Sequence, residues 1–124
     1  MIEMDAEKIV DLIVWLDLEV DNGGFHQFFN NSAGDKTADT IIALETIGAV
    51  LTANILRRAA AMFPGEMPPA NRDGRVAILW KLFPDPKVFY PLNEEFYAYP
   101  DDLLHRVEEF KSKNGLPPGP KWQI

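Results

Sequence analysis

The fold is decided by residues 21–35, which read DNGGFHQFFNNSAGD. Two glycines directly after an asparagine give the backbone the freedom that the end of a preceding apolar helix requires. Three phenylalanines then fall on one short helical turn, where their rings can be buried together. We therefore expect a helix break followed by a buried aromatic turn, formed by Asn22, Gly23, Gly24, Phe25, His26, Phe28 and Phe29.

Helices are predicted on both sides of this motif because apolar residues recur there at intervals of three and four. We expect helices over residues 3–20, 25–30, 37–47 and 51–62. Asp35 or Thr37 can cap the helix over 37–47, and Gly48 suits the left-handed position after it. The buried sides of the helices over 3–20 and 37–47 are expected to contain Ile2, Ala6, Ile9, Ile13, Leu16, Val20, Ala38, Ile41, Ile42 and Ile47.

The second half of the chain is expected to add two helices. Asn71 can cap the first, and Pro100 can open the second, with Asp101 and Asp102 in its first turn. Residues 84–99 between them are expected to be irregular or to contain a short helical turn. The buried residues of the two helices are expected to be Val76, Leu79, Trp80, Phe83, Leu103, Leu104, Val107 and Phe110.

No segment alternates apolar and polar residues as a half-buried strand does. The sequence therefore predicts an all-α fold without a sheet. It predicts a single compact domain of five to seven helices over residues 1–114, followed by a proline-rich tail over residues 115–124.

The 124-residue chain contains no cysteine, which fits a reducing compartment. A chain of this length can bury a sufficient core without metals or disulfides. The N-terminus lacks a basic segment before an apolar run, and no apolar run approaches the roughly 20 residues of a membrane span. We therefore expect a cytoplasmic protein with no membrane partner.

Negative charge is concentrated in the first part of the chain. Residues 1–50 contain ten Asp or Glu and two Lys, a formal charge of −8, within a net charge of −7 for the whole chain. Such a field repels nucleic acid and attracts basic partners. We expect a basic protein partner, such as a DNA-binding regulator, and no direct binding of nucleic acid.

Glu3, Glu7 and Asp11 recur every four residues, so they form a row on the first helix with about 6 Å between neighbours. Like charges at this spacing destabilise a helix, which favours a functional reason for them. Acids in a first turn also complement the helix dipole, so a solvated surface without a partner is the alternative. The predicted partner-binding residues are Glu3, Glu7, Asp11, Asp17, Glu19, Asp21, Asp35 and Asp39.

Trp15 and Leu18 lie beside the main apolar side of the first helix. They can form either a second contact with the core or the apolar part of an interface, and for Trp15 we favour core packing. Together with Trp122, they are the apolar residues that we expect at the interface of a homodimer.

The histidines offer little for catalysis. His26 has no second histidine or cysteine at ligand spacing, so we interpret it as a structural hydrogen-bonding residue rather than a catalytic base. His105 lies one helical turn from Asp101 and Glu109. This spacing could in principle form a metal site, but charge pairing on a solvated helix is far more common.

The adjacent carboxylates Glu94 and Glu95 would point about 100° apart on a helix, so they cannot easily serve one substrate as an acid and base pair. We expect them to cap or tie the last helix. The sequence predicts a protein that is not an enzyme and has no cofactor or metal.

Three blocks of the sequence carry a resemblance to known proteins: EVDNGGFHQFFN at residues 19–30, IALETIGA at 42–49 and EEFYAY at 94–99. Through these blocks the chain resembles the bacterial DNA-mimic protein domain family, over about residues 10–110. It departs from the family pattern at Asn30, where a third consecutive aromatic residue is common. The resemblance implies a small acidic all-helical domain that forms a dimer. It also implies carboxylates that imitate DNA phosphates and occupy the DNA-binding surface of a transcription regulator.

Three functional hypotheses follow. The first is an acidic interaction domain that excludes DNA from a basic partner. The second is an immunity or antitoxin-like protein that neutralises a cationic nuclease, which requires the same carboxylates and a different partner. The third is an uncharacterised enzyme that uses His26 and the glycine turn, which requires a pocket lined by His26.

Overall fold

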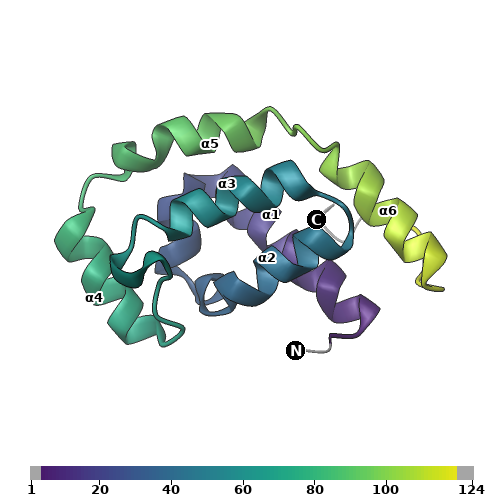
Figure 1. The fold of residues 1–124 in the computed structure, drawn as a ribbon, viewed down its shortest axis with the longest axis horizontal. Helices are drawn as coiled ribbons and strands as arrows, with labels where there is room; N and C mark the ends of the chain where they lie inside the picture. The colour runs from purple at the N-terminus through teal and green to yellow at the C-terminus, as the bar shows by residue number, and fades with distance from the viewer. Residues whose placement is uncertain (1–3, 120–124) are drawn as a thin grey trace.

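The computed structural model of the protein describes residues 4–119 (Figure 1). Within these residues the chain forms six α-helices and three short 3-10 helices, and no strand. The elements in chain order are α1 (Ala6–Asn30), η1 (Ser32–Lys36), α2 (Thr37–Thr46), α3 (Val50–Ala60), η2 (Pro64–Glu66), α4 (Arg72–Leu82), η3 (Pro86–Phe89), α5 (Tyr90–Tyr97) and α6 (Leu103–Lys113). The predicted all-α fold, a single compact domain without a sheet, is confirmed.

Helix α1 runs through the aromatic motif with a kink rather than an interruption. It begins after Asp5, whose carboxylate accepts a hydrogen bond from the Lys8 backbone N–H at 2.8 Å. The backbone leaves the helical conformation at Gly23 and Gly24, and Gly24 has φ 74° and ψ −173°, a region essentially restricted to glycine. The predicted break is therefore confirmed as a kink, and the two helices expected over 3–20 and 25–30 are the two arms of α1.

Helix α5 supplies the hydrogen bonds that the kink removes from α1. The buried side chain of Asn93 accepts the Phe25 N–H at 3.0 Å, and the Tyr97 hydroxyl donates to the Val20 carbonyl at 2.7 Å. A Cβ on Gly24 would lie 2.3 Å from the Asn93 amide nitrogen, so the close approach of α5 requires a glycine there. We had expected residues 84–99 to be irregular or to hold a short turn, and the structure corrects this with a two-turn helix.

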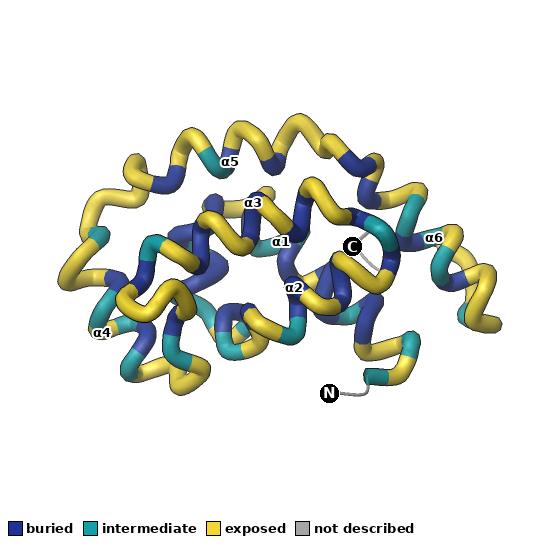
Figure 2. Tube along the Cα trace, in the orientation of Figure 1, coloured by how far each residue is buried: buried dark blue, intermediate teal, exposed yellow. Residues whose placement is uncertain are grey.

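The three phenylalanines of the motif are completely buried, as predicted. Phe25 contacts Phe96 of α5 edge to face, with ring centroids 5.9 Å apart. Phe29 contacts Phe63 at 4.9 Å. The rings therefore join α1 to α5 and to the segment after α3, and Figure 2 shows that the buried positions of α5 face these helices.

A buried arginine organises the C-terminal end of α1. Arg75 of α4 has no exposed surface, and its guanidinium donates to four backbone carbonyls and one carboxylate. The acceptors are the carbonyls of Phe29, Asn31, Pro69 and Ala70, at 2.7 to 3.1 Å, and the Asp35 carboxylate, at 2.7 Å. All five N–H groups of the guanidinium are thus used, and three segments of the chain meet at one side chain.

The start of α2 differs from the prediction. Asp35 does not cap this helix because its carboxylate binds Arg75, and the Thr37 hydroxyl instead donates to the Gly34 carbonyl at 2.8 Å. Ala38 and Ile42 are exposed, contrary to expectation, whereas Ala43 and Leu44 are buried. Gly48 has φ 82°, which confirms the left-handed position after the helix.

The last helix also begins later than predicted. Pro100 does not open it: Asp102, at φ 48°, precedes the first helical residue Leu103. Asp101 is buried and caps α3, because its carboxylate accepts both the backbone N–H and the hydroxyl of Thr52 at 2.6 and 2.8 Å. Leu104, expected to be buried, is exposed.

The helices form an elongated body with α4 at one end and α6 at the other (Figure 1). The first residues of the proline-rich tail fold back on α6, where the Gly119 carbonyl accepts from Lys111 at 2.5 Å and its N–H donates to Glu108 at 3.0 Å. Within residues 4–119 no helix combines the length and the apolar composition needed to cross a bilayer.

Candidate partner-binding groove

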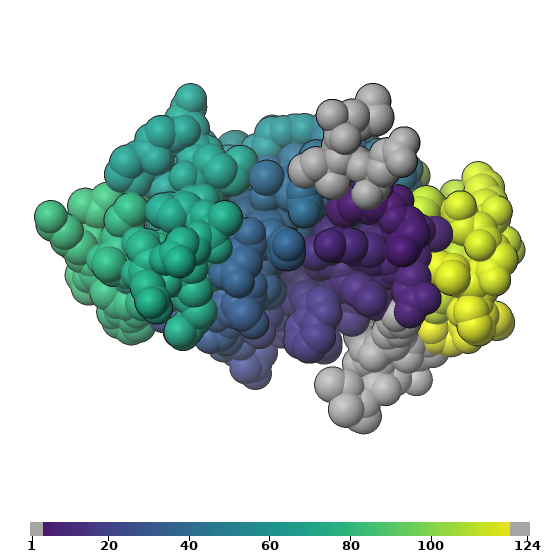
Figure 3. Space-filling view, turned by 90° about the horizontal axis from the view of Figure 1, so that it is seen from below, coloured from purple at the N-terminus to yellow at the C-terminus, as the bar shows by residue number. Residues whose placement is uncertain are grey.

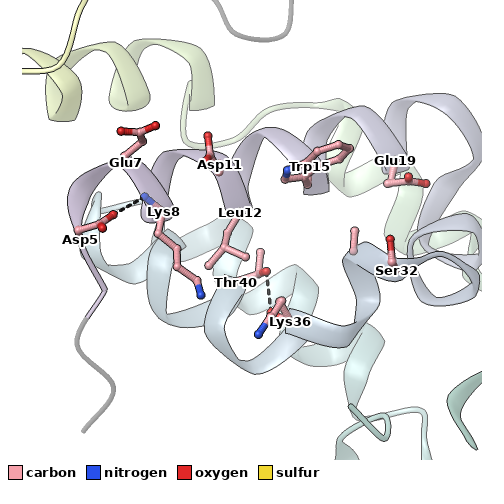
Figure 4. A pocket seen from close by; sticks show the side chains of 11 residues that line it. Asp5, Glu7, Lys8, Asp11, Leu12, Trp15, Glu19, Ser32, Lys36 and Thr40 are labelled. Carbon is pink, nitrogen blue, oxygen red and sulfur yellow. Dashed lines mark hydrogen bonds between the residues drawn. The ribbon is translucent and has the colours of Figure 1, made fainter. Parts of the chain in front are cut away.

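A groove of about 620 Å³ lies between the first arm of α1 and the segment formed by η1 and the start of α2 (Figure 4). In the space-filling view, the N-terminal part of α1 lies at the surface beside this segment (Figure 3). The groove is lined by Asp5, Glu7, Lys8, Asp11, Leu12, Trp15, Glu19, Ser32, Ala33, Lys36 and Thr40.

One wall of the groove is a row of four side chains on α1, which we call the α1 row: Glu7, Asp11, Trp15 and Glu19. They follow one another every four residues, so neighbours are about 6 Å apart along the helix axis. Three of the predicted partner-binding carboxylates are therefore brought to one surface. The row also contains an aromatic residue that we had not expected there.

Trp15 is 56% exposed, so the prediction that it packs in the core is wrong. Leu18, its neighbour in that prediction, is partly buried against the core. Trp80, at 51%, was also expected to be buried and is similarly exposed, but its indole N–H donates to Asn30 at 2.9 Å and its ring contacts His26 edge to face. The Trp15 indole N–H has no such acceptor among residues 4–119.

The opposite side of the groove carries positive charge and apolar surface. Lys8 of α1 and Lys36 of η1 are drawn next to each other below the α1 row, and Asp5, directly before α1, also lines the groove beside Lys8 (Figure 4). Leu12 and Ala33 add apolar surface between the walls. The groove therefore combines the carboxylates of the α1 row with two lysines, Asp5 and an apolar floor, rather than presenting negative charge alone.

Asp17 and Asp21 lie outside this groove and belong to a second cluster with Tyr99. The Tyr99 hydroxyl lies 2.9 Å from Asp17 Oδ1 and 2.8 Å from Asp21 Oδ2, and it has one proton to donate. Burial, assisted by the charge of Asp21, raises the pKa of Asp17 to about 6. Burial and both carboxylates also raise the pKa of Tyr99 above its usual range. The hydrogen bond from Tyr99 favours the ionised form of Asp17, but burial outweighs it, so the pKa of Asp17 is raised.

Besides Asp17 and Asp21, two more of the predicted partner-binding carboxylates have structural hydrogen bonds. Asp35 binds the buried Arg75, and Glu19 Oε2 accepts the side-chain amides of Gln27 and Asn31 at 2.8 and 2.9 Å. Asp39 lies in the first turn of α2, and Glu3 lies outside the described residues. The eight acidic residues are therefore divided among several environments.

The His26 side chain has a structural partner. It is buried, and its Nε2 donates to the Phe83 carbonyl at 2.9 Å, which ties α1 to the end of α4. None of the groove-lining residues is a histidine. Among residues 4–119, no group of three His, Cys, Asp or Glu is placed to hold a metal ion, and Asp101, one of the His105 neighbours, is used by Thr52.

Glu94 and Glu95 do not tie the last helix. Glu95 forms a two-pronged ion pair with Arg58, at 2.5 and 3.0 Å, and so joins α5 to α3. This partner lowers the pKa of Glu95, and the pair lies at the surface.

Sequence reasoning missed three residues that join distant segments: Arg75 at the end of α1, Asn93 at its kink, and Tyr99 beside Asp17 and Asp21. Each forms a hydrogen bond with a residue more than 40 positions away, and helical periodicity does not predict such contacts. For Asn93 and Tyr99 the available signal was the block at residues 94–99, because Asn93 directly precedes it and Tyr99 ends it, beside buried Phe96. The two most distinctive blocks of the sequence thus bind each other.

The sequence matches the model of one family, described as DMP19-like protein, over residues 4–114. Neither a curated protein nor a solved structure matches the chain.

Proposed function

Because the chain belongs to the DMP19-like protein family, the DNA-mimic family that its sequence resembles, we propose that it is an acidic interaction domain that acts as a DNA mimic. It binds the basic surface with which a partner protein, such as a transcription regulator or a nucleoid-type protein, binds DNA. The bound partner is thereby prevented from binding DNA.

The observation that carries this proposal is the α1 row. Glu7, Asp11 and Glu19 face one groove from a single rigid helix, and the first two stand about 6 Å apart along its axis, comparable with neighbouring phosphates of a nucleic acid strand. A helix holds these charges in place before a partner arrives, so little ordering cost accompanies binding. The formal charge of −8 over residues 1–50 adds long-range attraction for a basic surface.

The test uses the partner that the protein captures from its source cell at low salt. We expect a salt gradient to release this partner, because attraction between exposed charges is screened. DNA should compete with the protein for the partner. Replacing Glu3→Gln, Glu7→Gln and Asp11→Asn together should reduce the association rate about tenfold or more, and circular dichroism checks that the variant is folded.

A matched control removes three exposed carboxylates elsewhere, with Glu66→Gln, Asp73→Asn and Glu94→Gln. If both triple variants bind the partner equally well, or if the bound partner still takes up DNA, the DNA-mimic proposal is wrong. A captured partner that cleaves DNA, and that loses this activity when bound, would instead support the neutralisation of a cationic nuclease.

A further inference from the structure

We propose that the groove receives a basic amphipathic helix of the partner, and that one arginine of this helix stacks on Trp15 between Asp11 and Glu19. This inference rests on the proposed function, because it specifies how a basic partner is recognised. It goes beyond phosphate imitation, because a surface that only imitates phosphates requires carboxylates and no aromatic ring.

The exposure of Trp15 has no explanation within the described fold. Trp80 is about equally exposed, but its ring is held by Asn30 and His26. Trp15 has no hydrogen-bond acceptor for its indole N–H within residues 4–119, and it lies in a groove whose floor is apolar. A half-exposed tryptophan at the centre of a groove is typical of an interface contact.

The neighbours of Trp15 favour a guanidinium as its ligand. A guanidinium can stack on an indole face and donate hydrogen bonds in its own plane to carboxylates, which the compact ammonium of lysine does less well. Asp11 and Glu19 stand one turn before and one turn after Trp15. Glu19 is already held by Gln27 and Asn31 through Oε2, so its carboxylate is positioned before a ligand binds.

The charges of the groove residues determine which side of the proposed helix faces the α1 row. Lys36 of η1 and the Lys8 side chain beside it repel cations from the part of the groove below the α1 row, so the basic side of the proposed helix faces that row. Leu12 and Ala33 provide apolar surface for its other side. The charge pattern therefore fits an amphipathic basic helix better than it fits a uniformly cationic chain.

The test measures the binding of a fluorescently labelled amphipathic peptide, with arginine at every fourth position and leucine on the opposite face. Its control carries citrulline, which keeps the shape of arginine and lacks the charge. We expect the arginine peptide to bind at least tenfold more tightly than the citrulline peptide. Trp15→Leu should weaken its binding about tenfold or more, whereas Trp15→Phe, which keeps an aromatic face, should weaken it less.

Trp80→Leu is the matched control, because it removes an equally exposed tryptophan outside the groove. Circular dichroism checks that each variant is folded. Equal binding by Trp15→Leu and wild type, equal binding of the two peptides, or no binding of the arginine peptide at millimolar concentration would overturn the inference.

The two proposals fail in different ways. If the partner is released by salt and competes with DNA while Trp15→Leu has no effect on the peptide, the DNA-mimic function stands and the groove inference is wrong. If the peptide requires Trp15 but the bound partner still takes up DNA, the groove inference stands and the DNA-mimic function is wrong.

Discussion

At the scale of single residues, Arg75 has the largest structural role that the sequence analysis did not identify. Its guanidinium donates hydrogen bonds to carbonyls at the C-terminal end of α1, where the helix dipole favours a cation. It also forms an ion pair with Asp35, so this carboxylate has a structural role in addition to the partner-binding role predicted for it.

We expect Arg75→Met to lower the free energy of unfolding by about 3–5 kcal/mol, because it leaves buried carbonyls without donors. Urea denaturation measures the change. Arg58→Met is the matched control: it breaks an exposed pair with Glu95 and should cost at most about 1 kcal/mol. Similar losses for both variants would contradict the role assigned to Arg75.

Asp17 is expected to make stability depend on pH. Its pKa of about 6 in the folded protein exceeds the ordinary value of 3.8. The folded state therefore binds more protons between about pH 4 and pH 6, and this residue's contribution to stability is lost as the pH rises through that range. Above pH 6 the partly buried carboxylate is ionised in the folded protein, which lowers the free energy of unfolding, because the same charge is solvated in the unfolded chain.

Asp17→Asn keeps an oxygen acceptor for Tyr99 and removes the charge. We expect it to be more stable than wild type by roughly 1 kcal/mol at pH 7, after allowance for solvent screening, and equally stable below pH 4. Thermal unfolding of both proteins across this pH range gives the difference. A difference that does not change with pH would show that Asp17 is not the titrating group.

At the scale of elements, the contact between the α1 kink and α5 determines the fold. The kink leaves the Phe25 N–H and the Val20 carbonyl without partners in α1, and Asn93 and Tyr97 replace those partners. The kink in turn gives α5 room to approach, because Gly24 has no Cβ. The two elements are therefore interdependent.

The two glycines of the kink should respond differently to substitution. Gly24→Ala is expected to lower stability by about 1–3 kcal/mol from backbone strain alone, and by more because its Cβ would meet Asn93. Gly23→Ala should cost less, because its φ of −156° is not left-handed, although its Cβ would lie 2.1 Å from Oε1 and 2.8 Å from Cβ of Gln27, so that residue would have to shift. Gly65→Ala, with φ 75° and open space around it, measures strain without a clash.

Chemical denaturation ranks the three glycine variants. We expect Gly24→Ala to be the least stable. If it is no less stable than Gly65→Ala, then the approach of α5 does not depend on the missing Cβ.

At the scale of the whole molecule, the family resemblance implies a dimer, and exposed Trp15 is a candidate contact together with Leu18 and Trp122. Trp122 lies outside the described residues, and Leu18 is partly buried. We expect sedimentation at tens of micromolar to show a mass above that of the 14.0 kDa chain.

The Trp15→Leu variant distinguishes a role of Trp15 in the homodimer interface from a role in binding a basic partner. A dimer that persists in this variant leaves Trp15 available for a partner. A variant that becomes monomeric would place Trp15 in the dimer interface, and the groove inference would then be wrong. Only 14.0 kDa species for wild type would exclude the dimer itself.

Local sequence was sufficient for the aromatic motif and for most of the helices, although not for α5. The glycine pair, the three phenylalanines and the caps at Gly48 and Asn71 act within a few residues of themselves, so their roles can be predicted from spacing and backbone preference. The concentration of acidic residues in the first fifty positions is likewise a property of composition.

Burial and pairing were decided by contacts between distant segments. Periodicity places Trp15 near the core side of α1, but whether another helix covers it depends on how α2 packs, and the structure leaves it in a groove. Packing also places the acidic residues in different environments. Asp35 binds Arg75 and Asp17 binds Tyr99, in each case dozens of positions away in the sequence. The periodicity of a sequence describes one helix at a time. The partner of a charged side chain depends instead on how several helices pack against one another.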